Sequence, residues 1–377
     1  MQGDKLITKD YILTSLFSFT TFTSFYFLLA TLPLYILTIG GSESEIGLII
    51  GIFTISAVIF RLFLGREADV RGKKKILVLS SLMFLIAMFI YSLTSSVAEL
   101  LALRLFHGVA WAGVTTSAGA IIADLVPEKR RGEGMGYYGM FANLAMGFGP
   151  ALGMAIANIY GFNSMFFSAS AIAVLALLIS LSIKGSYKSG RIKSAEASML
   201  SRGALFPSTV MLLVTMTYGS IVSFLPLHAR SVGIENPGIF FTPYAVVLLI
   251  TRPIAGKLSD KYGRRLVIIP GIILMGLGML ALSYTLTLSI LLLVALLYGM
   301  GFGSVQPTLM ALTVDRVRPE RRGAAMGTFS SAFDLGIAIG SIFLGVVLQV
   351  TSFKIMYICA AFASLIGLFV FLIGRKG

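Results

Sequence analysis

The sequence predicts an all-α membrane protein with twelve transmembrane helices, arranged as two six-helix bundles related by an internal repeat. Hydrophobic residues make up 57% of the chain and charged residues 12%, and the mean hydropathy is +0.92. Apolar stretches of about 20 residues, the length of a helix that crosses a bilayer, recur along the chain. A membrane β-barrel would instead show segments of about 10 residues alternating in polarity, whereas stretches such as 76–92 are apolar on every face.

The apolar stretches define the expected helices. Their ranges are 10–39, 44–65, 75–94, 97–124, 132–159, 162–184, 204–231, 236–257, 265–285, 287–315, 321–349 and 352–374. An even number of spans puts both termini on one side of the membrane. Most of the 30 basic residues fall in the termini and loops of that side, which the positive-inside rule makes cytoplasmic. The net charge of +14 is therefore interpreted as a topology signal, and we expect no nucleic-acid partner.

The N-terminal segment and the cysteine content indicate whether the chain is processed and whether it forms disulfides or binds a metal. Lys5 and Lys9 precede a span that is too long for a signal-peptide core, so we expect the first helix to remain in the mature protein. The single cysteine, Cys359, leaves no intrachain disulfide. The sequence holds no Cys/His cluster with metal-ligand spacing. We therefore expect neither a metal site nor a cofactor.

The two halves of the chain repeat one another at a constant offset of 191 positions, as between Arg61 and Arg252. Gly65, Asp69, Gly72, Gly108, Asp124, Gly136 and Gly149 match Gly256, Asp260, Gly263, Gly299, Asp315, Gly327 and Gly340 in the same register. A long fixed period indicates two related units. We therefore predict an N-terminal bundle at 1–184, a polar cytoplasmic linker at 185–203, and a C-terminal bundle at 204–377.

One motif occurs once in each half. The segment from Gly65 to Lys74 reads G-R-E-A-D-V-R-G-K-K, and the segment from Gly256 to Arg265 reads G-K-L-S-D-K-Y-G-R-R. Both resemble the signature loop of the major facilitator superfamily, G-x-L-a-D-r-x-G-r-k, although the first copy departs from it at its third and sixth positions. The resemblance covers essentially the whole chain. It implies a transporter with the fold of that superfamily.

These two segments are also the expected cytoplasmic gate. Lys and Arg complement helix carbonyl ends and anionic headgroups, and an Asp can accept hydrogen bonds from a helix N-terminus. Asp69 and Asp260 are therefore candidates for holding the cytoplasmic side shut in one state. A static loop clamp is the alternative. The gate residues are Gly65, Asp69, Gly72, Lys73, Gly256, Asp260, Gly263 and Arg264.

The expected helix 97–124 carries Arg104, His107, Trp111 and Thr115 on one face. An intramembrane arginine is costly unless it faces protein or water, so this face should point inward. The segment around Arg104 resembles the superfamily motif R-x-x-q-G, in which the arginine faces the cavity and is linked to proton transfer. His107 replaces the usual glutamine. We expect it to be a packing histidine, with titration as the alternative.

Small residues and a proline mark the expected helix 132–159. Gly136, Gly149, Pro150 and Gly153 resemble the antiporter motif G-x8-G-x3-G-P-x2-G-G of drug/proton exporters, with Ala145 and Met154 in place of two of its glycines. The second half has Ser341 where Pro150 would repeat. Such residues allow close packing and a bend. The motif favours efflux, and packing without a bearing on direction is the alternative.

Asp334 lies near the middle of the expected helix 321–349. A carboxylate at membrane depth favours its neutral, protonated form unless a cation offsets it, which a proton carrier requires. The alternatives are an interhelical hydrogen bond or an ion pair with Arg252 or Arg104. The proton-coupling candidates are Asp334, Arg104 and His107.

The substrate cavity should form near the midplane between the two bundles. The candidate lining residues are Tyr26, Arg104, Trp111, Tyr218, Phe224, Tyr298, Gln306, Phe329 and Asp334. An aromatic cavity with one acid would suit lipophilic cations through apolar and cation–π contacts.

These observations favour a proton-coupled exporter of amphipathic, drug-like molecules that works by alternating access. The alternatives are an importer or facilitator of a polar metabolite such as a sugar or organic anion, and a non-transporting membrane sensor. No P-loop or catalytic spacing is present, so we do not expect an enzyme. The expected partners are a small-molecule substrate, protons and the bilayer of the plasma or inner membrane, with the protein acting as a monomer.

Overall fold

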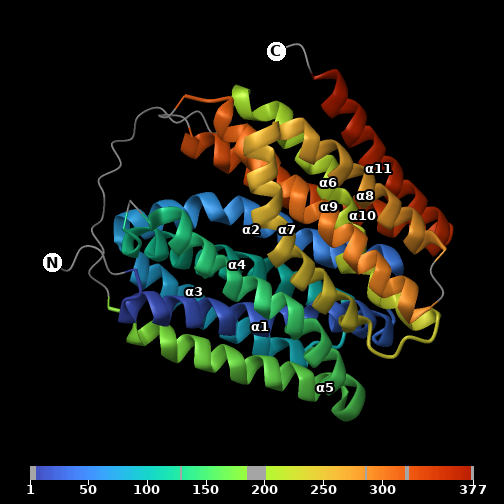
Figure 1. Cartoon of the computed structure of the whole chain (residues 1–377). Coiled ribbons are helices and arrows are strands. Elements are labelled where there is room, and N and C mark those ends of the chain that lie inside the picture. The colour runs from blue at the N-terminus through green and yellow to red at the C-terminus, as the bar shows by residue number, and fades with distance from the viewer. Residues whose placement is uncertain (1–5, 128–129, 185–200, 285–286, 319–321, 375–377) are drawn as a thin grey trace.

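The computed structural model describes residues 6–127, 130–184, 201–284, 287–318 and 322–374, and these residues form helices and no strand (Figure 1). The helices of the first half, the N half, are α1 Lys9–Thr38, α2 Glu43–Arg71, α3 Lys73–Ile90, η1 Tyr91–Leu93, α4 Val97–Leu125 and α5 Arg131–Ser182. Those of the second half, the C half, are η3 Arg202–Ala204, α6 Leu205–Ser231, η4 Pro237–Phe240, α7 Phe241–Tyr262, α8 Arg264–Ser283, α9 Leu288–Asp315, α10 Arg322–Val350 and α11 Phe353–Ile373. Most of the predicted linker, 185–200, lies outside the described residues.

Helix α5 contains both of the helices predicted at 132–159 and 162–184, which a kink separates. It is one element of 52 residues with a non-helical backbone at Gly161, where φ is 85°. A straight helix of that length would measure about 80 Å, far more than the roughly 30 Å of a bilayer core. Figure 1 shows that α5 folds back on itself. It therefore supplies two spans, and the eleven long apolar helices among the described residues make twelve crossings.

The two copies of the signature segment are mostly helical rather than loops. Helix α2 continues to Arg71 and α7 to Tyr262, beyond the predicted ends at 65 and 257. The turn to the next helix is one residue in each half, Gly72 with φ 98° and Gly263 with φ 94°. Only glycine adopts this conformation without strain. The two glycines let α3 and α8 begin immediately after the preceding helix.

The halves pack internally and then against each other. In the N half α1 packs on α5 and α2 on α4, and in the C half α6 packs on α10 and α8 on α9. Between the halves α2 contacts α10, and α5 contacts α7. In Figure 1 the two halves converge at the lower right and diverge at the upper left, the side on which both termini lie. We call this the terminal side and the opposite one the distal side.

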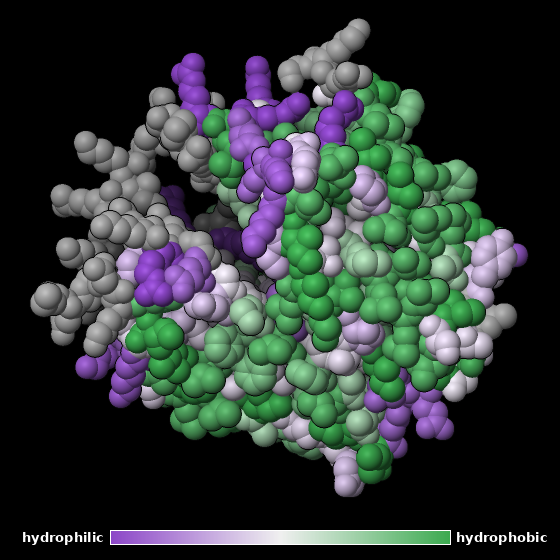
Figure 2. All heavy atoms as spheres, in the orientation of Figure 1, coloured by the Kyte–Doolittle hydropathy of each residue, from purple (hydrophilic) through white to green (hydrophobic). Residues whose placement is uncertain are grey.

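Large apolar side chains cover the outer surface. Leu79 on α3, Leu178 on α5 and Phe362 on α11 each expose about half of their area, and Figure 2 shows a broad hydrophobic surface over the C half. Contiguous exposed apolar surface of this size is unfavourable in water but matches lipid tails. The chain is therefore a multi-pass membrane protein.

Glycines at matching positions of the repeat allow close helix contacts in both halves. A Cβ on Gly149 would lie 2.7 Å from the Cβ of Tyr26 on α1, and one on the matching Gly340 would lie 2.3 Å from the carbonyl oxygen of Met216 on α6. Lipid offers no hydrophobic driving force between helices, so small residues that let backbones approach supply much of the packing energy. The two glycines hold equivalent helix pairs together in the two halves.

We predict that Gly340→Ala destabilises the protein by about 1–3 kcal/mol, the usual cost of overpacking, because the new methyl group meets backbone atoms that cannot move aside. Gly327→Ala on the same helix is the matched control, since a Cβ there has no atom within 4 Å. Both changes add the same helix propensity. Thermal unfolding of the detergent-purified variants measures the difference, and equal melting temperatures would contradict the packing argument.

Candidate functional site

A cavity of about 250 Å³ lies between the two halves. Helices α1, α2, α4 and α5 line it from the N half, and α6, α7, α9 and α10 line it from the C half. Figure 2 shows the molecule hollowed on the terminal side, with hydrophilic side chains inside the hollow. The cavity is thus positioned where a ligand would contact both halves at once.

The structure brings six of the nine predicted cavity residues together. Those that line the cavity are Tyr26, Arg104, Trp111, Tyr218, Gln306 and Asp334. The other three are packed inside the C half and do not line it: Phe224 and Tyr298 are fully buried, and Phe329 is 3% exposed. The hydroxyl of Tyr298 shares a 2.8 Å hydrogen bond with Thr217 on α6. These helices are apolar on every side, so the sequence could not distinguish the inward face from the packed one.

An ion pair between Arg61 on α2 and Asp334 on α10 crosses from one half to the other inside the cavity. The Arg61 side chain is 31% exposed and that of Asp334 16%. Neither Arg252 nor Arg104, the partners considered from the sequence, makes this contact. Sequence reasoning missed Arg61 as a site residue. The internal repeat could have found it, since Arg61 and Arg252 match and Asp334 matches Asn143.

Arg252, which matches Arg61 in the repeat, contacts an amide instead of a carboxylate. Arg252 on α7 donates from Nη2 to Oε1 of Gln306 at 2.9 Å, and its buried Nε has no hydrogen-bond partner. Asn143, the neutral counterpart of Asp334, lines the same cavity. The cavity therefore contains two arginines at symmetry-related positions, of which one has a carboxylate partner.

Arg104 is held by the N half. Its Nε donates to the carbonyl oxygen of Ile49 at 3.3 Å, its Nη1 donates to the hydroxyl of Tyr91 at 3.4 Å, and its guanidinium carbon lies 4.3 Å from the centroid of the Phe53 ring. The side chain is 5% exposed. These contacts fix the position of its charge at the cavity wall, where a polar group is costly unless it is paired.

His107 lies one helical turn from Arg104 but does not reach the cavity. Its ring is fully buried among aromatic rings, including Phe25, Phe53 and Phe84. Its Nδ1 shares a 2.9 Å hydrogen bond with the hydroxyl of Tyr91. The same hydroxyl accepts from Arg104, so the histidine supports the position of the arginine through Tyr91. This placement fits the packing interpretation, and the proton-coupling role of His107 remains a prediction.

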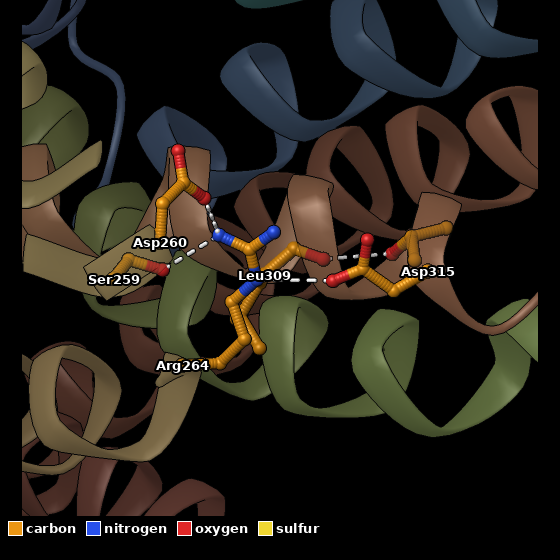
Figure 3. Close-up of polar contacts among 6 residues, drawn as sticks. Ser259, Asp260, Arg264, Leu309 and Asp315 are labelled. Carbon is orange, nitrogen blue, oxygen red and sulfur yellow. Dashed lines mark hydrogen bonds and ion pairs between the residues drawn. The ribbon is translucent and has the colours of Figure 1, made fainter. Parts of the chain in front are cut away.

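The signature segments form matching ion pairs on the terminal side. Lys73 contacts Oδ2 of Asp124 at 2.7 Å in the N half, and Nε of Arg264 contacts Oδ2 of Asp315 at 3.0 Å at the matching positions of the C half. Arg264 also donates from Nη1 to Asp260 at 2.5 Å and to Ser259 at 2.8 Å (Figure 3). Each of these contacts ties a turn to a helix of its own half. The gating role of Asp69 and Asp260 remains a prediction.

The antiporter-like residues join α5 to its neighbours. A Cβ on Gly153 would lie 2.7 Å from the carbonyl oxygen of Phe27 on α1, and Gly149 contacts the same helix. Pro150 lies against η4, where a Cβ on Gly238 would be 2.3 Å from its carbonyl oxygen. Nothing lies within 4 Å of such an atom on Gly136. Three of the four residues therefore serve close packing on the distal half of α5.

Close contacts shut the distal side. Asn236 in the C half donates to the carbonyl oxygen of Ala151 at 3.1 Å, and Thr242 donates to that of Gly147 at 2.6 Å. A Cβ on Gly47 of α2 would lie 2.1 Å from the carbonyl oxygen of Ser341 on α10. The halves thus meet on the distal side and separate on the terminal side, which leaves the cavity approachable from the terminal side.

We predict that Arg61→Gln and Asp334→Asn each destabilise the protein, because each leaves an uncompensated charge in the cavity. The loss should be about 1–3 kcal/mol, below the range for fully buried pairs, since Arg61 keeps 31% of its side chain exposed. The double variant should recover part of the loss. Glu133→Gln, which breaks the exposed Arg130–Glu133 pair, is the control and should cost under about 1 kcal/mol. Strictly additive losses in thermal unfolding would rule out the coupling.

Comparison with known proteins agrees with this architecture. The chain is 27% identical over 373 residues to an uncharacterised MFS-type transporter of Methanocaldococcus jannaschii, covering 96% of both chains. It is 26% identical to the staphylopine export protein of Staphylococcus aureus, covering 92% of this chain and 90% of that one. It is 24% identical to the multidrug resistance protein MdtG of Escherichia coli, covering 94% and 91%.

Solved structures share the fold. A bacterial homologue of the human lysosomal transporter Spinster, in an inward-facing and occupied conformation, superposes with a TM-score of 0.84 at 16% identity, covering 97% of this chain and 96% of that one. A mutant of the nucleoside transporter NupG also gives 0.84, at 17% identity, covering 98% and 100%. The model of the Major Facilitator Superfamily matches residues 14–250 and 236–377. With its twelve crossings, its repeat and its cavity between two halves, the chain belongs to the Major Facilitator Superfamily and is a transporter rather than an enzyme.

Proposed function

We propose that this protein exports amphipathic small molecules by alternating access, with proton coupling at Asp334. The observation that carries the proposal is the Arg61–Asp334 ion pair, which joins the two halves inside the cavity. A transporter must couple ligand binding to a change in the contact between its halves. An ion pair across the cavity provides such a contact in the place where substrate binds.

Protonation gives Asp334 its role in the cycle. Of the described residues that line the cavity, Asp334 is the one carboxylate. When it binds a proton its charge is lost and the attraction to Arg61 weakens, so the halves can separate there. When it releases the proton the pair re-forms. Because the group lies at membrane depth, a proton from either side of the bilayer would reach it only through the cavity.

Alternating access requires that the closed side of the cavity opens while the open side closes. The distal contacts of Gly47, Asn236 and Thr242 would break in the outward-facing state. The signature segments on the terminal side would then come together. In this cycle the Lys73–Asp124 and Arg264–Asp315 pairs keep each half rigid, so that the halves move as bodies.

The direction of transport is inferred from two supports. Gly149, Pro150 and Gly153 resemble the exporter motif and pack closely against α1 and η4, and the relatives named above include a multidrug resistance protein and an export protein. We therefore propose efflux across the cell inner membrane, with both termini cytoplasmic, the protein working as a monomer and the proton gradient as energy source. Import of a polar metabolite is the second candidate, because the nucleoside transporter NupG shares the fold.

The test uses inverted membrane vesicles energised acid-inside, to which neutral, cationic and anionic amphipathic compounds are added in turn. An exported compound should enter the vesicles and trigger proton release. We predict that Asp334→Asn abolishes the proton release, because the amide cannot carry a proton through the cycle. The control is Glu235→Gln, the same chemical change at an exposed position on the distal side, which should transport as the wild type does.

Two results would contradict the proposal. Proton release that persists in Asp334→Asn would remove the coupling role from this residue. If no compound moves protons in vesicles while labelled nucleosides, sugars or organic anions accumulate in intact cells, the protein is an importer.

A further inference from the structure

The charges that face the cavity are unbalanced. Of the described residues lining it, three are arginines and one is an aspartate: Arg61, Arg104, Arg252 and Asp334. The ion pair neutralises Arg61 and Asp334. Arg104 and Arg252 then leave an excess of two positive charges on a wall of low dielectric. Such a site attracts an anion and repels a cation, the opposite of the lipophilic cation that the sequence favoured.

Arg252 has bonding capacity that the protein does not use. One Nη2–H donates to the neutral amide oxygen of Gln306, while the buried Nε has no hydrogen-bond partner. Arginine presents its donors in a rigid planar fork that fits a carboxylate, sulfonate or phosphonate through two parallel hydrogen bonds. A buried guanidinium donor without a partner is costly. A ligand anion in the cavity would give the guanidinium a charged acceptor, which Gln306 does not provide.

The repeat explains why this acceptor is missing. Arg61 and Arg252 occupy matching positions, and so do Asn143 and Asp334. In the structure Arg61 is paired with the aspartate. At the symmetry-related place the chain has an asparagine that also lines the cavity. The N half therefore provides a neutral amide where symmetry would place a second carboxylate, and Arg252 keeps its charge.

The surroundings of Arg252 suit the rest of an amphipathic ligand. Tyr26, Tyr218 and Tyr244 line the cavity together with Arg252, and their hydroxyl groups can donate further hydrogen bonds to an anion. The ring of Tyr218 stacks on that of Phe302 with centroids 5.3 Å apart. Both residues line the cavity. An apolar body can lie against these rings while the acidic group reaches the guanidinium.

We infer that the cavity binds small amphipathic organic anions, with the acidic group held by Arg252 and the apolar body against the aromatic rings of Tyr218 and Phe302. This inference rests on the proposed function, because it names the substrate class of the same cavity. Arg104 adds to the positive potential from the opposite wall and is held there by its own half. The Arg61–Asp334 pair does not hold the anion, so Asp334 remains available to bind a proton.

The experiment measures binding to the detergent-purified protein through the fluorescence of Trp111, the one tryptophan of the chain, which lines the cavity. Three probes share one body and differ in charge: 4-phenylbutyrate, 4-phenylbutanol and 4-phenylbutylamine. In the wild type we expect the carboxylate to bind at least about tenfold more tightly than the amine, as a single favourable charge contact allows. Equal affinities, or no fluorescence response to any probe, would overturn the inference.

Two variants assign the effect to Arg252. Arg252→Gln should lower the affinity for phenylbutyrate to that for phenylbutanol. Asn143→Asp keeps the arginine but supplies the missing carboxylate, so it should remove the anion preference in a protein whose Arg252 is intact. Lys261→Gln, at the terminal-side end of the same helix and outside the cavity lining, is the charge-matched control and should bind as the wild type does. Anion preference that survives both cavity variants would exclude Arg252 as the binding group.

Binding in detergent does not depend on transport, so the two proposals fail separately. Anion-selective binding without proton release in vesicles would contradict the proposed export and leave the substrate class in place. Export of neutral or cationic compounds by a protein that does not prefer anions would contradict the inferred substrate class and leave the proposed export in place.

Discussion

The hydrocarbon core of a membrane leaves no water for charged groups, and the structure is organised around the few charges placed there. Arg61 and Asp334 come from different halves and neutralise each other inside the cavity. Without this pair each would be a partly buried charge without a counterion, at a cost of about 1–3 kcal/mol. Because the two partners belong to different halves, the proposed protonation of Asp334 would act directly on the contact between them.

Helix packing supports this interaction from both sides. Glycines at matching positions of α5 and α10 let these helices approach α1 and α6, and the ion pairs of Lys73 and Arg264 fix the terminal-side turns. Since each half is internally tight, the proposed cycle places the movement at the surfaces between them. The distal side is closed mainly by backbone contacts at Gly47 and Gly238, which can separate without breaking a buried charge pair.

The two halves differ at two positions where one of them has a charged residue of the cavity. Asn143 stands opposite Asp334 in the repeat, and Ala295 stands opposite Arg104. The C half therefore contributes the acid of the cavity, and the N half contributes an arginine held by Tyr91 and Phe53. An aspartate in place of Asn143 would give the cavity a second carboxylate, at the position that matches Asp334. With asparagine there, Arg252 contacts an amide rather than a carboxylate, and the Arg61–Asp334 pair alone is assigned the coupling in the proposed cycle.

The sequence by itself determined the helical class, the number of crossings and the repeat, because lipid accepts only backbone that is hydrogen-bonded within its own segment, and hydropathy records this directly. It also indicated six residues of the cavity, since polar or aromatic groups on the expected inward helices are few. Only the tertiary structure decided that Asp334 pairs with Arg61 and that Phe224, Tyr298 and Phe329 are packed away. Periodicity identifies an inward face only where polar and apolar residues alternate, and in helices that are apolar all round the facing direction is set by the neighbours they pack against.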